Sequence, residues 1–222
     1  MTTAAIETLD AGLPDPRVML RAADMIRHGG VVAHPTETFY GLAADPFSDR
    51  GVDRLRAAKG LEAGRAVLLL LTHRDAVHDL ARLEGAARTW FESLARVFWP
   101  GPLTLVLPAR SGIRCPALGT ESGVAVRVSS HPVALQLART AGGPITSTSA
   151  NRTGSPPASD AGAIGADLRE RIDLVLDGGL CPGGLPSTLL DLTQDRPRLV
   201  RIGAIDAAAL QTVLGFRPAG VF

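Results

Sequence analysis

Short aliphatic runs alternate with segments of helical periodicity along this chain, and this alternation constrains its fold more than any other feature. The runs are bounded by glycine, proline or polar residues and predict buried strands at 31–34, 67–71, 103–107 and 124–128. Apolar residues at helical spacing predict helices at about 16–28, 51–59, 74–82, 85–97, 132–141, 159–171 and 206–214. We therefore expect an α/β fold built on a twisted, open, mixed sheet with flanking helices.

Composition and charge limit the functions open to the chain. Its 222 residues are 45% hydrophobic and 20% charged, which is typical of a globular chain, and we expect one domain over residues 1–222. The net charge of +1 does not favour a nucleic-acid or lipid surface, so any such site has to be local. Cys115 and Cys181 have no ligand-spaced neighbours, and no secretory leader or long apolar span precedes the fold, so we expect a cytoplasmic protein without zinc or membrane contact.

The motifs of several common enzyme classes do not occur in the sequence. It contains no GxxxxGK[ST], no GxGxxG after a strand, no GxSxG and no HExxH. Asp45, Asp49 and Asp53 recur at intervals of four residues, and turn or helix-capping roles fit them better than metal ligation. We predict no resident metal site.

Four loop segments that we expect to follow strands combine hydroxyl groups, glycine and proline. They are His34–Leu42, Trp99–Thr104, Ser147–Asn151 and Leu185–Thr188. Ligands bind at strand ends in open α/β sheets, and hydroxyls, backbone N–H groups and fixed cations suit phosphate and carboxylate oxygens. The cations beside predicted element ends are Lys59, Arg65, Arg127 and Arg201. Each loop alone is equally typical of a simple turn, but together the loops favour a binding site.

The chain also resembles a known family in several strings that occur in a fixed order. They are PTETFYGLAAD, Lys59-Gly60, WPGPLTLVL, VAVRVSSHP, STSANRTGSPP, DGG, PSTLLDLT and RIGAI, and they are similar to the YrdC-like domain family of threonylcarbamoyladenylate synthases. The resemblance covers about residues 16–205. It implies a large, concave, cationic cavity in a short, single-domain form of the family.

The resemblance further implies a reaction. L-threonine, bicarbonate or CO2, and ATP would give pyrophosphate and threonylcarbamoyladenylate, the activated donor for threonylcarbamoyladenosine in tRNA. Such a reaction needs no covalent nucleophile, so the protein would act by positioning and charge neutralisation. Mg2+ would arrive with ATP, bound mainly by triphosphate oxygens and water.

The resemblance also implies roles for individual residues. Lys59 and Arg65 are expected to be catalytic cations, and Thr36, Tyr40, Arg65 and Arg127 to contact the amino-acid substrate. Arg127 can also serve the nucleotide or form a structural ion pair, and Tyr40 can also be a core residue. The expected nucleotide contacts are Lys59, Ser147, Ser149, Ala150, Asn151, Ser187 and Arg201, with backbone N–H groups of the Ala150–Asn151 turn facing a phosphate.

One segment departs from the family pattern. The family commonly has arginine and proline directly after the lysine and glycine, whereas this chain has Leu61 and Glu62. Arg65 would then replace the missing cation. We expect the segment 59–65, to which Gly60 and Gly64 give backbone freedom, to be a mobile lid on which Lys59 and Arg65 contact the anionic substrate and Glu62 turns to solvent.

Two alternative functions remain open at this point. The chain can be a paralogue that acts on another carbamate or carbamoyl compound. It can also be a non-catalytic factor that binds tRNA or double-stranded RNA through an arginine patch formed by Arg88, Arg96, Arg110 and Arg114. If the chain is instead a synthase, as the family resemblance implies, a downstream tRNA-modifying transferase is the expected partner.

Overall fold

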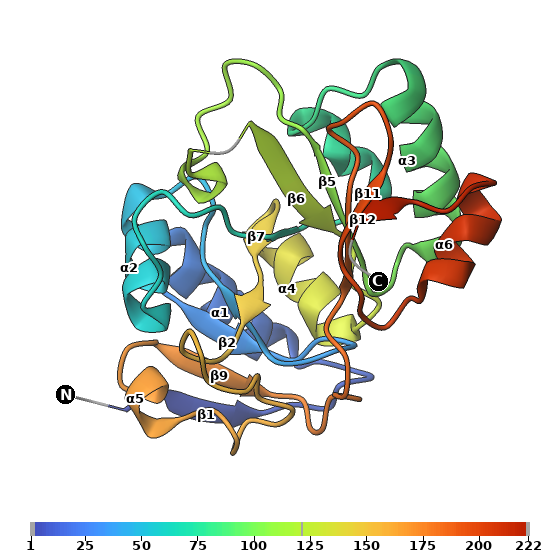
Figure 1. The fold of residues 1–222 in the computed structure, drawn as a ribbon. Coiled ribbons are helices and arrows are strands. Elements are labelled where there is room, and N and C mark those ends of the chain that lie inside the picture. The colour runs from blue at the N-terminus through green and yellow to red at the C-terminus, as the bar shows by residue number, and fades with distance from the viewer. Residues whose placement is uncertain (1–2, 121, 221–222) are drawn as a thin grey trace.

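The strands form two mixed sheets in the computed structural model, which describes residues 3–120 and 122–220 (Figure 1). The first sheet has the order β1-β9-β2-β3-β8, with strands Ala5–Thr8, Leu174–Asp177, Val32–His34, Gly41–Ala43 and Thr148–Ser149. The second has the order β12-β11-β10-β5-β6-β4-β7, with strands Ala219–Gly220, Arg198–Arg201, Thr188–Asp191, Leu103–Pro108, Gly123–Arg127, Leu69–Leu70 and Ile145–Thr146. The predicted mixed α/β class is confirmed, and the strands divide between two sheets.

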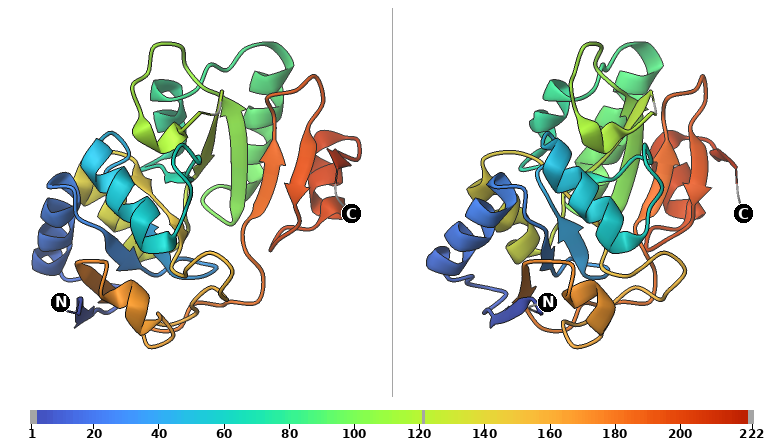
Figure 2. Two further views of the ribbon diagram at one scale, coloured as in Figure 1. Left: turned by 60° about the vertical axis from the view of Figure 1, so that its left-hand side comes forward. Right: turned by 90° about the vertical axis from the view of Figure 1, so that its left-hand side faces the viewer.

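Helices pack against the faces of both sheets (Figure 2). They are α1 (Pro16–Arg27), α2 (Asp49–Lys59), α3 (Gly85–Phe98), α4 (Pro132–Ala141), α5 (Ala166–Arg169) and α6 (Ala207–Leu214). Helices α1 and α4 bury their apolar faces against β2 and β9 of the first sheet, and α3 lies beside α6 at the second sheet. Across residues 3–120 and 122–220, none of these helices combines the length and apolarity that crossing a bilayer requires.

Local signals placed most of the helices correctly. The Asp15 side chain accepts a hydrogen bond from the Arg17 N–H at 2.8 Å, and Pro16 occupies the first helical position of α1. Helix α2 ends at Gly60, whose φ of 68° lies in the left-handed region that favours glycine. The helices predicted at 16–28, 51–59, 85–97, 132–141 and 206–214 are confirmed to within two residues at each end.

Three predicted elements were wrong in extent or type. The helix predicted at 159–171 is only α5, because the Asp160 carboxylate accepts from the Ala163 N–H and closes a turn before Gly165 caps the helix. The segment predicted as a helix at 74–82 is the 3-10 turn η1, Arg74–Asp79, since Ala81 bridges to Ala109. A second 3-10 turn, η2, spans Pro116–Leu118. The strand predicted at 67–71 keeps sheet pairing only at β4.

Candidate active site

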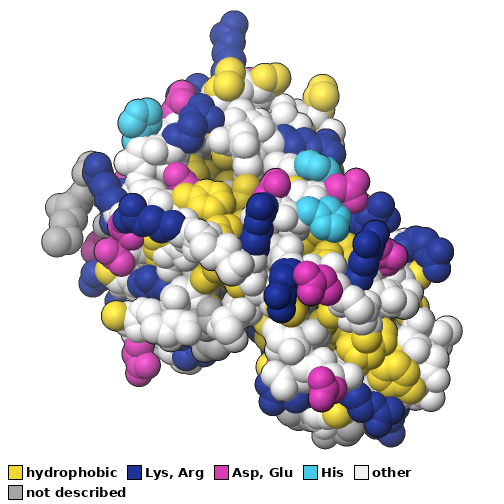
Figure 3. Space-filling view, turned by 90° about the horizontal axis from the view of Figure 1, so that it is seen from above, with side chains coloured by type: hydrophobic (Ala, Val, Ile, Leu, Met, Phe, Trp, Pro, Cys, Tyr) yellow, Lys and Arg dark blue, Asp and Glu magenta, His cyan; other side chains and the backbone are white. Residues whose placement is uncertain are grey.

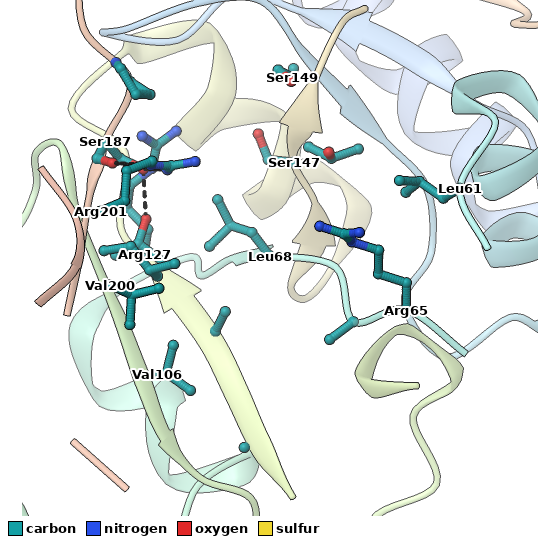
Figure 4. Close-up of a pocket in the computed structure, with 18 of the residues that line it drawn as sticks. Leu61, Arg65, Leu68, Val106, Arg127, Ser147, Ser149, Ser187, Val200 and Arg201 are labelled. Atoms are coloured by element: carbon teal, nitrogen blue, oxygen red, sulfur yellow. Dashed lines mark hydrogen bonds between the residues drawn. The ribbon is translucent and has the colours of Figure 1, made fainter. Parts of the chain in front are cut away.

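A cavity of about 1160 Å3 receives side chains from both sheets. One wall comes from the loop between β2 and β3, from residues 147–151 (the STSAN loop) and from residues 59–68. The other comes from β5, β6, β10 and β11. Figure 4 shows Arg127, Arg201 and Ser187 together on one side, with Arg65 and Leu61 opposite them. Most of the site residues that the family resemblance implied therefore line one cavity.

Two of the four loop segments do not follow strands as predicted. Trp99–Thr104 leads from α3 into β5, and Leu185–Thr188 leads into β10. Strands β5 and β10 are parallel, so their first residues lie side by side, and the Thr104 and Ser187 hydroxyl oxygens are 2.8 Å apart. The start of these strands, rather than their end, faces this part of the cavity.

Arg201 lies on β11 and is an exposed residue beside these hydroxyls. Its guanidinium donates to the Ser187 carbonyl oxygen at 2.8 Å and to the Ser187 hydroxyl at 3.2 Å. Burial lowers the pKa of Arg201, and the positive charge of Arg127 lowers it further. Arg201 forms no ion pair within residues 3–120 and 122–220. It is therefore a cation held by neutral oxygens, with its positive charge available to an anion.

Arg127 lies at the end of β6 with a side chain only 3% exposed. Its guanidinium is 3.6 Å from the carboxylate of Glu37 and contacts the Thr38 hydroxyl at 3.5 Å. The structure therefore shows the ion pair that was one of the alternatives for Arg127, in a residue that also lines the cavity.

Lys59 reaches across from the last turn of α2 to the STSAN loop. Its ammonium donates to the carbonyl oxygen of Asn151 at 2.8 Å, to the side-chain oxygen of Asn151 at 3.1 Å, and to Ser149. The residue is 5% exposed, and burial lowers its pKa to about 8. Lys59 thus fixes the shape of the loop while it lines the cavity.

The backbone N–H groups of the STSAN turn do not face the cavity as predicted. The Ala150 N–H donates to the Tyr40 carbonyl oxygen at 2.7 Å, and the Asn151 N–H donates to the Ser149 carbonyl oxygen at 2.9 Å. Ala150 itself is buried. The groups that this loop offers to a ligand are the side chains of Ser147, Ser149 and Asn151.

The Ser147 hydroxyl is oriented by a buried histidine. His34 Nδ1 lies 3.2 Å from the Pro35 carbonyl oxygen, which can only accept, so Nε2 is left to accept from the Ser147 hydroxyl at 3.4 Å. Complete burial lowers the pKa of His34 to about 3 and keeps the ring neutral. Ser147 therefore directs its proton inward and its lone pairs towards the cavity, which suits a hydrogen-bond donor on a ligand better than a phosphate oxygen.

The hydroxyl groups of Thr36 and Tyr40 are hydrogen-bonded to other parts of the protein. The Thr36 hydroxyl donates to the Phe39 carbonyl oxygen at 2.7 Å and accepts from the Thr38 N–H at 3.1 Å. The Tyr40 hydroxyl donates to the Gly179 carbonyl oxygen at 2.8 Å, and burial raises its pKa. Both residues line the cavity, but their hydroxyl protons already have partners in the protein.

The C-terminal end of the segment 59–65 is held by two hydrogen bonds. Arg56 donates to the Arg65 carbonyl oxygen at 2.8 Å, and the Thr120 N–H donates to the Gly64 carbonyl oxygen at 3.0 Å. Arg65 is exposed and points into the cavity in Figure 4, with no side-chain hydrogen bond among the described residues. Glu62 is exposed as well, as expected, and it also belongs to the cavity lining.

Sequence reasoning missed several residues of the site. Glu37, His34 and Ser129 lie behind the cavity wall, and Thr104 and Thr38 line it. The only available signal was position: Glu37 and Thr38 lie within the PTET string, and Thr104 ends WPGPLT. Their partners come from distant parts of the chain, so the string alone could not assign a role to them.

The surface arginines do not form a uniform cationic field. Arg88 pairs with Glu92 at 2.8 Å, and Arg114 pairs with Asp49 at 2.6 Å. The face seen in Figure 3 mixes Lys and Arg with Asp and Glu. The structure thus offers the RNA-binding alternative only a patch whose charge is partly neutralised.

Comparison with known proteins identifies the family. A family model named Sua5_yciO_yrdC, described as "Telomere recombination", matches residues 24–203. This chain belongs to that family. It is 37% identical over 194 residues to a protein of Pyrococcus abyssi and 37% identical over 203 residues to one of Bacillus subtilis, both named threonylcarbamoyl-AMP synthase.

These alignments cover 87% and 90% of this chain. The chain spans only 56% and 57% of the length of these two relatives. A crystal structure of the Sua5 protein of P. abyssi complexed with L-threonine superimposes with a TM-score of 0.90 at 33% identity, covering 98% of this chain and 63% of that one.

Proposed function

We propose that this chain synthesises threonylcarbamoyl-AMP from L-threonine, bicarbonate or CO2, and ATP, and releases pyrophosphate. The observation that carries the proposal is the set of cations at the cavity that have no acidic partner among the described residues: Lys59, Arg65 and Arg201. A triphosphate supplies the negative charges that these groups lack. The family membership and the names of the relatives support the same reaction.

The chemistry suits a site without a nucleophile. The amine of threonine attacks CO2 and loses a proton to form a carbamate, and a carbamate oxygen then attacks the α-phosphorus of ATP as pyrophosphate leaves. Arg201, Ser187 and Thr104 would hold phosphate oxygens, and Arg65 would approach from the opposite wall. The inward-turned proton of Ser147 leaves its lone pairs to accept an N–H or O–H of a substrate.

Mg2+ belongs to this proposal as part of the substrate MgATP. No group of three or more His, Cys, Asp or Glu side chains among the described residues could hold a metal ion, so triphosphate oxygens and water would hold Mg2+. The product would pass to a transferase that modifies tRNA, in the cytoplasm.

The test is a pyrophosphate-release assay with ATP, Mg2+, bicarbonate and one amino acid at a time, with the nucleotide product identified by mass spectrometry. We expect release with threonine, slower release with valine, and none without bicarbonate. The site variant to be compared with the native protein is Arg201→Gln. It should retain the fold and release pyrophosphate at least tenfold more slowly. Release that does not depend on bicarbonate would contradict the proposal, and a preference for another amino acid would favour the paralogue.

A further inference from the structure

Glu37, on the loop between β2 and β3, is a largely buried acid that pairs with the cavity cation Arg127. Its side chain is 12% exposed and lies behind the cavity wall, where Arg127 separates it from the lining. One carboxylate oxygen is 3.6 Å from the Arg127 guanidinium, and the other accepts from the Ser129 hydroxyl. Glu37 therefore acts on the cavity only through Arg127.

The charges on this wall are unevenly balanced. Arg127, which is buried, and Arg201, which is exposed, lie near each other (Figure 4), and the charge of Arg127 disfavours the charged form of Arg201. Glu37 is paired with Arg127, whereas only neutral oxygens of Ser187 contact Arg201. Two guanidinium groups thus share one carboxylate, which leaves about one uncompensated positive charge on the wall.

The Arg127–Glu37 contact is itself incomplete. The Nε of Arg127 and the Oε1 of Glu37 are buried without a hydrogen-bond partner. At 3.6 Å the two groups attract by charge more than by an ideal bidentate hydrogen bond. The charge of Arg127 is therefore largely compensated by Glu37, although the two groups do not satisfy each other's hydrogen bonds.

We propose that Glu37 is a positioning residue that acts through Arg127 and limits the affinity of the cavity for polyanions, so that pyrophosphate can leave. Without Glu37, the wall would carry two uncompensated guanidinium charges, and a polyanion would become their counterion. The identity of the polyanion as a reaction product rests on the proposed function, whereas the effect of Glu37 on anion affinity does not.

The test is calorimetric titration of the full chain with inorganic pyrophosphate, without amino acid or nucleotide. Glu37→Gln keeps the size of the side chain and removes its charge, and we expect pyrophosphate to bind at least tenfold more tightly than to the native protein. Binding that is unchanged or weaker would overturn the proposal. If the glutamine variant does not fold, Glu37→Asp draws the carboxylate back from Arg127 and should tighten binding two- to fivefold, and an unchanged affinity there would overturn it equally.

The matched control is Asp173→Asn. Asp173 also combines an ion pair, with Arg54 at 2.9 Å, and a hydrogen bond, from the Val31 N–H, but it does not line the cavity. Its removal should lower stability and leave pyrophosphate affinity within threefold of the native value. An equal tightening in this variant would show a general charge effect and overturn the role of Glu37.

Kinetics supply a readout that a purely structural role would not give. If Glu37→Gln slows product release, kcat and the KM for ATP should fall together, whereas simple damage to the wall would raise KM. A raised KM would count against the proposal. Failure of the native protein to release pyrophosphate from ATP and threonine would refute the proposed function, and the calorimetric result would still decide the role of Glu37.

Discussion

Replacing Lys59 with methionine tests whether burial of the charged ammonium destabilises the folded protein. Lys59 is 5% exposed and donates to oxygens of Ser149 and Asn151, none of which belongs to a carboxylate. Burial lowers its pKa from 10.5 to about 8. In the unfolded chain the amine keeps its proton up to about pH 10.5, whereas in the folded chain it loses the proton above about pH 8.

The sign and size of the effect follow from proton linkage. Between these two pKa values the unfolded state binds more protons, so the free energy of unfolding rises with pH. For the shift of Lys59, the linkage relation gives a gain of roughly 1.3 kcal/mol between pH 7 and pH 9. Burial raises the pKa of Cys181 to about 11, which works in the opposite direction above pH 9, so the native protein alone would not isolate the lysine.

The assay is urea denaturation of the native protein and Lys59→Met at pH 7 and pH 9. Cys181 is present in both proteins, so its effect cancels in the difference between them. We expect the stability of the native protein relative to the variant to increase by about 1 kcal/mol from pH 7 to pH 9. A difference that stays constant would refute the reasoning, because it would show that the oxygens of the STSAN loop keep Lys59 fully charged.

Two further predictions test residues of the site, and a third tests a close approach between two backbone segments beside it. Arg65→Ala should change stability by less than about 0.5 kcal/mol, since the side chain makes no hydrogen bond among the described residues, but should lower turnover at least tenfold, as measured by pyrophosphate release. Thr36→Val should lower the free energy of unfolding by roughly 1–3 kcal/mol, because the Thr38 N–H and the Phe39 carbonyl lose their partner, and thermal unfolding would detect this. Gly119→Ala should destabilise more than Gly112→Ala in denaturant titrations, since both have positive φ but only at Gly119 would the new Cβ meet a backbone oxygen, that of Gly64, at 1.8 Å; equal losses would contradict the close approach.

The sequence predicted those parts of the fold that depend on interactions between residues close together in the chain. Helix α1 followed from Asp15 and Pro16, whose effects are local. The strands β9, β10 and β11 were missed because four-residue strands are too short to show a distinct period. The division into two sheets depends on pairings between distant segments, such as β3 with β8, which hydrophobic patterns do not encode.

The site was predicted as a set of residues but not as a set of contacts. Family strings pointed to Lys59, Ser149 and Arg201, which line one cavity. The error at Ala150 arose because its N–H partner, the Tyr40 carbonyl, lies on another hairpin far along the chain. Glu37 was overlooked because an acid in a loop looks like any turn residue until β6 brings Arg127 to it.

The cavity is lined by residues of both sheets, and this has a consequence for ligand design. A ligand that contacts both Ser149 on β8 and Arg201 on β11 would act as a non-covalent cross-link between the two sheets. At saturation it would raise the melting temperature by mass action, whereas a fragment that touches one wall would bind without coupling the sheets. Linking two such fragments, one for each side of the cavity, would therefore combine their binding energies and also restrict the movement of one sheet relative to the other.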